Sequence, residues 1–117
     1  MRELLRDPLR IDHMIESIEN INSFMQGKTL DDLKNDKLLF FGVVKNIEIL
    51  GEAANNLSPE FKSKHTDIPW RKISGMRHVL VHDYYQINPE EVFLVYQYDL
   101  PELKQKLINL VPPPAHS

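Results

Sequence analysis

The sequence predicts an all-α fold, an up-and-down helical bundle of four main helices with a short extra turn and a kinked last helix. Apolar residues recur at the three-and-four spacing of buried helix faces, and no segment sustains the period-two alternation of a strand. Connecting segments are short, so successive helices should lie roughly antiparallel. With 117 residues and 42% hydrophobic content, the chain can bury the core of one domain. We expect that domain over residues 1–111 and a Pro-rich disordered tail over 112–117.

The first two helices follow from apolar stripes. Gly27 can end the first stripe, and Thr29 with Asp32 can cap a short turn that leads into the second, over 38–57. Gly51 lies within that second stripe and costs about 1 kcal/mol relative to alanine, so a close helix crossing is expected there. The first stripe is Ile11, Met14, Ile15, Ile18, Ile21 and Met25, and the second is Phe40, Val43, Val44, Ile47, Leu50, Ala54 and Leu57.

The other helices are predicted from caps and prolines. Ser58-Pro59 combines an N-cap with a first-turn proline and starts a short turn. A third helix should run from about Pro69 to about Asp83, with Trp70 in the core. Asn88-Pro89 opens the last helix, which Pro101 should kink or split.

The composition limits the classes of function and the kinds of site that this chain can have. The formal charge is −3, from 14 basic and 17 acidic residues, so no global positive field favours nucleic acid and any RNA contact must be local. Cysteine is absent, which excludes disulfides and thiolate zinc sites. The longest apolar run, 38–41, is too short to cross a bilayer, and we expect a cytoplasmic protein with no membrane contact.

Residues that could take part in catalysis are concentrated in one segment, 77–84. It carries Arg77, His78, His82 and Tyr84 among apolar residues. Arginine offers a permanent cation with a planar donor fork suited to phosphate, and histidine can exchange a proton near neutral pH. That combination suits phosphodiester cleavage without a metal.

Helical geometry complicates this interpretation. Arg77 and His82 point about 140° apart on an ideal helix, whereas Arg77 and Tyr84 nearly coincide. A distorted helix, long side chains that reach round to a common cleft, or a second subunit could each bring Arg77 and His82 together.

Other interpretations of the segment stay open. His78 and His82, four residues apart, could chelate a metal, with a third ligand from Asp83, Glu52 or His65. The histidines could also be merely hydrogen-bonded or exposed, and Tyr84 could be an aromatic residue at the edge of the core.

Arg77-x4-His82-x-Tyr84 resembles the signature of HEPN-domain toxins of the HepT type, which pair with a minimal nucleotidyltransferase antitoxin, MntA. Further blocks resemble this family in the same order, so that the match spans approximately residues 9–111. They are 47–57 with its Gly51-Glu52-Ala53-Ala54 motif, Ile68-Pro69-Trp70 with Ile73 and Gly75-Met76, and Asp99-Leu100-Pro101 with Leu103.

The resemblance implies a helical bundle that forms a homodimer, in which two Arg–His pairs meet in one cleft. It implies a metal-independent endoribonuclease without a cofactor, whose products carry a cyclic 2′,3′-phosphate. His82 would act as general base on the ribose 2′-hydroxyl or as general acid on the leaving 5′-oxygen, and Arg77 would hold the scissile phosphate. His78 would contact phosphate or orient another group.

The resemblance also implies that Tyr84 accepts AMP from an MntA-like antitoxin in a type VII-like toxin-antitoxin system, which silences the toxin. Glu52 could orient Arg77 or lie on a solvated helix face. Two other functions stay open: a catalytically idle module that binds RNA or nucleotide, and a partner that only docks a nucleotidyltransferase.

Overall fold

The computed structural model describes residues 2–82 and 87–110, with side chains for 6–76 and 87–110, and every regular element in these ranges is helical. Four long or composite segments form the bundle, as predicted, with two short helices between them. The elements are α1 (Arg2–Met25), α2 (Leu30–Asn35), α3 (Lys37–Asn55), α4 (Pro59–Lys64), α5 (Trp70–His82), α6 (Pro89–Leu94), the π-helical turn η2 (Val95–Asp99) and α7 (Leu100–Leu110).

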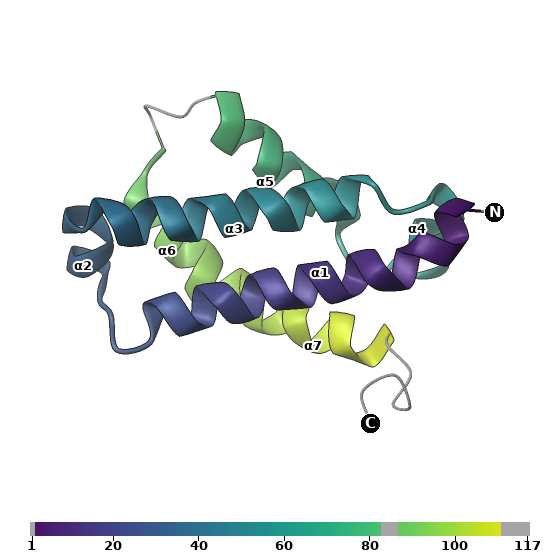
Figure 1. Ribbon diagram of the computed structural model, residues 1–117, viewed down its shortest axis with the longest axis horizontal. Helices are drawn as coiled ribbons and strands as arrows, with labels where there is room; N and C mark the ends of the chain where they lie inside the picture. Colours follow the sequence, from purple (N-terminus) through teal and green to yellow (C-terminus); the bar gives the residue numbers. More distant parts are fainter. Residues whose placement is uncertain (1, 83–86, 111–117) are drawn as a thin grey trace.

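The helix α3 lies at the centre of the molecule. Figure 1 shows it between α1 and α5, with α6 and α7 crossing behind, and successive long helices run in opposite directions. The up-and-down arrangement predicted from the short connections is therefore confirmed.

The core is continuous and includes the predicted stripes. Trp70, expected in the core, is buried. Phe40 and Ile15 are only partly buried, at the margin of the core. The buried apolar residues are Ile11, Met14, Ile18, Ile21, Met25, Leu33, Leu39, Val43, Val44, Ile47, Leu50, Ala54, Leu57, Ile68, Trp70, Ile73, Val92, Leu100, Leu103 and Leu107.

The predicted helix boundaries are confirmed at the caps. Gly27, just after α1, has a φ of 72°, a conformation that side chains other than glycine's rarely adopt. Thr29 and Asp32 form a reciprocal capping box at the start of α2. The Ser58 hydroxyl accepts the Phe61 amide at α4, and Asn88 caps α6.

The second long helix is slightly shorter than its stripe. It ends at Asn55, and Leu57, although buried, lies just beyond it. Gly51 is buried within α3. Its small size is consistent with the close packing of α3 between two neighbouring helices.

Proline affects the last helix ahead of its own position. The segment 89–110 stays helical throughout, but the turn before Pro101 widens into η2. Proline lacks an amide hydrogen, and its ring crowds the carbonyl four residues earlier, in this chain that of Gln97. The expected irregularity is therefore present as a π-helical turn.

Two polar links, one buried and one partly buried, join distant segments. The Asp7 carboxylate, 1% exposed, accepts the Ser58 amide at 2.9 Å and the Ser58 hydroxyl at 2.5 Å, which ties α1 to the start of α4. The Asn20 amide donates to Asn46 Oδ1 at 3.1 Å and so links α1 to α3. Polar groups satisfied in this way fix the register of the helices that they join.

No helix in the described part of the chain is both long and apolar enough to cross a membrane. The tail predicted over 112–117 lies outside the described residues, so it and the domain limit at residue 111 stay predictions.

Candidate functional site

The first half of α5 is anchored in the core. The Trp70 indole donates to the His65 carbonyl at 2.9 Å, and its ring lies 6.1 Å from that of Phe61. Ile73 is buried one turn further along. These contacts fix the direction in which α5 leaves the α4–α5 connection and runs back along α3.

The backbone of the predicted catalytic residues lies in the second half of α5. Arg77, His78 and His82 are all helical, and His82 is the last residue of α5. Their side chains lie outside the described residues, as does Tyr84 entirely. Their roles therefore stay predictions.

The continuity of α5 bears on how Arg77 and His82 could meet. No interruption separates them, so their positions differ by about 140° around the helix axis. The distorted helix is thus not observed. Long side chains that reach a common cleft, and a cleft completed by a second subunit, remain.

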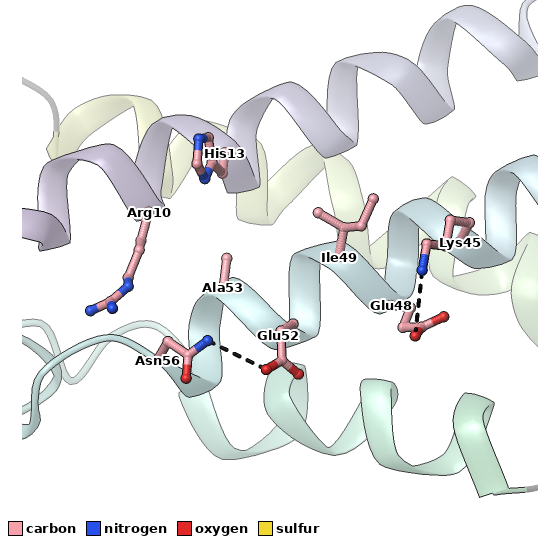
Figure 2. A pocket seen from close by; sticks show the side chains of 8 residues that line it. All are labelled: Arg10, His13, Lys45, Glu48, Ile49, Glu52, Ala53 and Asn56. Carbon is pink, nitrogen blue, oxygen red and sulfur yellow. Dashed lines mark hydrogen bonds and ion pairs between the residues drawn. The ribbon is translucent and has the colours of Figure 1, made fainter.

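Glu52 lies on α3, exposed to solvent. Its carboxylate accepts the Asn56 side-chain amide at 3.4 Å. In Figure 2, Ile49 and Ala53 point toward α1, whereas Glu48 and Glu52 point to the opposite side of α3, where α5 lies. This side of α3 is the one required for Glu52 to orient Arg77, and that role stays a prediction.

The groove that holds Glu52 was not predicted. It measures about 340 Å³ and is lined from α1 by Arg10 and His13, and from α3 by Lys45, Glu48, Ile49, Glu52, Ala53 and Asn56 (Figure 2). Lys45 Nζ lies 3.7 Å from Glu48 Oε1. Polar residues at three-and-four spacing on both helices were the available signal, but they resemble those of any solvated helix face.

Two basic residues near the Arg77–His82 segment, Lys62 and Lys72, contact polar groups of this chain. Lys72 Nζ lies 3.6 Å from Asp99 Oδ1, and the Lys62 ammonium donates to the Asn55 carbonyl at 3.4 Å. Arg71, in the first turn of α5, is exposed.

Among residues with described side chains, no group of three or more His, Asp or Glu could hold a metal ion. His78, His82 and Asp83 are outside that set, so the two-histidine chelate is untested.

Comparison with known proteins identifies the fold family of this helix arrangement. The family model described as "Ribonuclease HepT-like" matches residues 14–110, which include α5 and the groove residues of α3. No solved structure matches the chain.

Three curated relatives are similar over most of the chain. "Gamma-glutamylcyclotransferase and putative RNase MJ0434" of Methanocaldococcus jannaschii is 36% identical over 101 residues, which are 86% of this chain. This chain spans only 46% of that protein's length. "Putative RNase TTE0752" of Caldanaerobacter subterraneus is 32% identical over 86% of this chain and 90% of that protein.

"Probable ribonuclease HepT" of Thermococcus cleftensis is 34% identical over 100 residues, which are 86% of this chain and 91% of that protein. The family model covers the helices from the second half of α1 to the end of α7. The chain belongs to the family of HepT-like ribonucleases.

Proposed function

We propose that this protein is an endoribonuclease that cleaves RNA without a metal ion and acts as the toxin of a type VII-like toxin-antitoxin system. The observation that carries the proposal is the family match over residues 14–110, which spans the Arg77-x4-His82 helix. The ribonuclease names of relatives that this chain nearly covers end to end support the same activity.

Cleavage begins with the ribose 2′-hydroxyl. Its oxygen attacks the adjacent phosphorus as one imidazole removes its proton, and the bond to the 5′-oxygen breaks as that oxygen gains a proton. The products carry a 2′,3′-cyclic phosphate and a 5′-hydroxyl. His82 serves as base or acid, and the His82 of a partner subunit takes the other role.

Arg77 holds the scissile phosphate and stabilises the negative charge that grows on its oxygens. Its guanidinium stays charged at any physiological pH, so it needs no proton exchange for this role. His78 contacts a neighbouring phosphate, and Glu52, on the α5 side of α3, orients Arg77.

Tyr84 is the point of control. Its phenol oxygen attacks the α-phosphorus of ATP in the active site of an MntA-like nucleotidyltransferase, pyrophosphate leaves, and the phenol proton is lost. The product is AMP in phosphodiester linkage to Tyr84. Because residues 77 and 84 share one side of an ideal helix, the attached phosphate competes with RNA for Arg77.

The nuclease activity is tested on RNA in excess chelator. We expect cleavage in chelator, products with cyclic phosphate ends, and no cleavage of a substrate with a 2′-deoxyribose at the scissile position. Arg77→Ala and His82→Ala should each abolish it, whereas Arg71→Ala, on the same helix, should keep most of it. A requirement for added metal would instead favour the His78–His82 chelate.

The control step is tested by intact mass. After incubation with ATP and the cognate transferase, the protein should gain one or more AMP units and lose nuclease activity. Tyr84→Phe should gain none, with Tyr85→Phe as the matched control. An unchanged gain in Tyr84→Phe would contradict the assignment.

A further inference from the structure

The groove between α1 and α3 has two ends of different chemistry. Figure 2 shows Arg10 and Asn56 together at one end and the Lys45–Glu48 pair at the other. From Glu48 to Asn56, α3 rises by about 12 Å, and the groove measures about 340 Å³. A space of this size suits a small ligand or one unit of a chain.

Arg10 is a positioned cation at its end of the groove. Its side chain is 19% exposed, and Nη1 lies 3.9 Å from a carboxylate oxygen of Asp7, which is 1% exposed. Ser58 donates to both oxygens of Asp7, from its amide and from its hydroxyl. A side chain held in this way loses little freedom when it binds an anion, and the donor fork of a guanidinium suits a phosphate group.

The other end of the groove offers a donor beside an acceptor. Lys45 Nζ lies 3.7 Å from Glu48 Oε1, and the two side chains are 65% and 35% exposed. Such a solvated pair contributes little to stability, so each partner can bind another group at small cost. An ammonium beside a carboxylate matches the Watson–Crick edge of guanine, where the O6 acceptor is followed by the N1 and N2 donors. Adenine, cytosine and uracil do not present an acceptor followed by two donors.

The middle of the groove is apolar on the side of α1. Ile49 is 39% exposed there, and Ala53, one turn further along α3, is half-buried. A base whose face lies against Ile49 can turn its edge toward the Lys45–Glu48 pair. The cationic end, the apolar middle and the donor–acceptor end then follow the order of phosphate, ribose and base in one nucleotide.

The groove fits a nucleotide better than a protein partner. Among its described lining residues, Ile49 is the one large apolar side chain. Protein partners are usually anchored by a cluster of aromatic and apolar residues, which the groove does not offer. A single-stranded nucleotide instead needs a cation for its phosphate and polar groups for its base edge, and the two ends supply them.

The Lys45–Glu48 end lies toward the predicted catalytic residues. Both residues belong to the middle of α3, and Figure 1 shows the C-terminal end of α5 above that part of α3. Arg77 and His82 belong to this half of α5. Glu48 also points to the side of α3 where α5 lies (Figure 2). A nucleotide in the groove can therefore neighbour the scissile phosphate in one RNA strand.

From these observations we propose that the groove binds a guanine nucleotide of the RNA substrate, next to the scissile bond. Arg10 holds its phosphate, and the Lys45–Glu48 pair binds the Watson–Crick edge of its base. The inference rests on the proposed function, since it names the base that the proposed ribonuclease selects. Its test does not need cleavage, because 2′-fluoro RNA lacks the attacking hydroxyl and can be bound without being cut.

Binding of 2′-fluoro hexamers tests the base preference. Each hexamer carries one guanine, inosine or adenine among uridines, and fluorescence anisotropy measures its affinity for the wild-type protein. The guanine hexamer should bind about tenfold tighter than the adenine hexamer and about threefold tighter than the inosine hexamer, which lacks the 2-amino donor. No binding, or equal affinities for the three hexamers, would overturn the inference.

Glu48→Gln tests the carboxylate. The preference for guanine should disappear, because an amide offers one acceptor oxygen in place of two. Glu102→Gln is the matched control, since Glu102 pairs with Lys106 at 3.6 Å on α7 and the groove residues come from α1 and α3. A preference kept in Glu48→Gln, or lost equally in Glu102→Gln, would contradict the assigned contact.

Salt dependence tests Arg10. Arg10→Gln should weaken the three hexamers equally and reduce the slope of log affinity against log salt by about 0.7, the value of one phosphate contact on a single strand. Arg6→Gln, at an exposed position one turn earlier on α1, should leave the slope unchanged. If Arg10→Gln does not fold, Arg10→Lys keeps a charge beside Asp7 without the planar fork and should still weaken all three. An unchanged slope in folded Arg10→Gln, or an unchanged affinity in Arg10→Lys, would contradict the phosphate contact.

Cleavage and GMP separate the remaining outcomes. If the wild type cuts unmodified RNA but binds the three hexamers equally, the inference falls and the nuclease proposal stands. If the wild type prefers guanine, Glu48→Gln loses that preference and no RNA is cut, the nuclease proposal falls and the groove assignment stands. GMP that binds as tightly as the guanine hexamer would assign the groove to a free nucleotide and overturn its assignment to RNA.

Discussion

The two faces of α3 differ in which side chains they bury and which they leave exposed. On the inner face Val43, Ile47 and Leu50 are almost wholly buried against the other helices. On the outer face Leu38 is 85% exposed and Ile49 is 39% exposed. The inner face accounts for the fold, and the outer face carries apolar side chains that stay exposed in the single chain.

The largest expected effect tests the inner face. Leu50→Ala should lower the free energy of unfolding by about 2–5 kcal/mol, because it leaves a cavity where α3 is fully buried. Urea denaturation measures this loss. Ile108→Ala, at a position of α7 that is 39% exposed, should cost less than about 1 kcal/mol. Equal losses in the two variants would contradict the assigned core.

Next in size is the buried link between α1 and α4. Ser58→Ala removes the hydroxyl that donates to Asp7 and accepts the Phe61 amide. We expect a loss of about 2–3 kcal/mol, since the buried Asp7 carboxylate loses a partner. Ser63→Ala, whose hydroxyl donates to the Glu60 carbonyl at an exposed site, is the control and should be nearly neutral. Similar melting temperatures for the two variants would show that the link contributes little.

Two glycine substitutions should change stability in opposite directions. Gly42→Ala places a methyl group in ordinary contact with the Phe24 ring, within α3, and should stabilise by about 0.5–1 kcal/mol. Gly27→Ala, at a φ of 72°, should destabilise by about 1 kcal/mol. Thermal unfolding measures both, and a destabilised Gly42→Ala would mean that the Phe24 ring cannot yield.

The smallest expected effect concerns the ion pair between α2 and α6. Lys34 Nζ lies 2.6 Å from Glu90 Oε1. This contact lowers the pKa of Glu90 and raises the pKa of Lys34. The contribution of Glu90 is therefore present above its ordinary value of 4.5 and is lost as pH falls through the lowered pKa.

The contribution of Lys34 is present below 10.5 and is lost as pH rises through the raised pKa. Both groups are exposed to solvent, so Lys34→Met should lower the melting temperature only slightly at pH 7. At pH 2.5 the difference from wild type should shrink. A difference that grows at acid pH would contradict the assigned pairing.

The sequence predicted the inner face of α3 well and the outer face poorly, for one physical reason. Burial within the chain produces the spacing of Val43, Ile47 and Leu50, and periodicity detects it. Phe41 and Ile49 lie on the exposed side of α3, where no burial within the chain determines their spacing. The caps at Thr29, Ser58 and Asn88 were predictable because local hydrogen bonds determine them.

The candidate site, like α3, could be predicted from the sequence only in part. The helix that carries Arg77 and His82 follows from its own sequence, and its continuity is confirmed. The groove of Arg10, His13 and Lys45 was missed because it depends on how α1 packs against α3. A cleft formed by two chains depends on still another packing step, which one chain's periodicity does not encode.

Mixing wild-type protein with an inactive variant tests the central claim, a cleft shared by two copies, most directly. His82→Ala protein is added to an equal amount of wild-type protein under conditions that exchange subunits. If one cleavage needs the His82 of both copies, half of the dimers become mixed and inactive and only a quarter stay wild type, so cleavage should fall to about half of its value before mixing. Exchange confirmed by mass without any loss of cleavage would contradict the shared cleft.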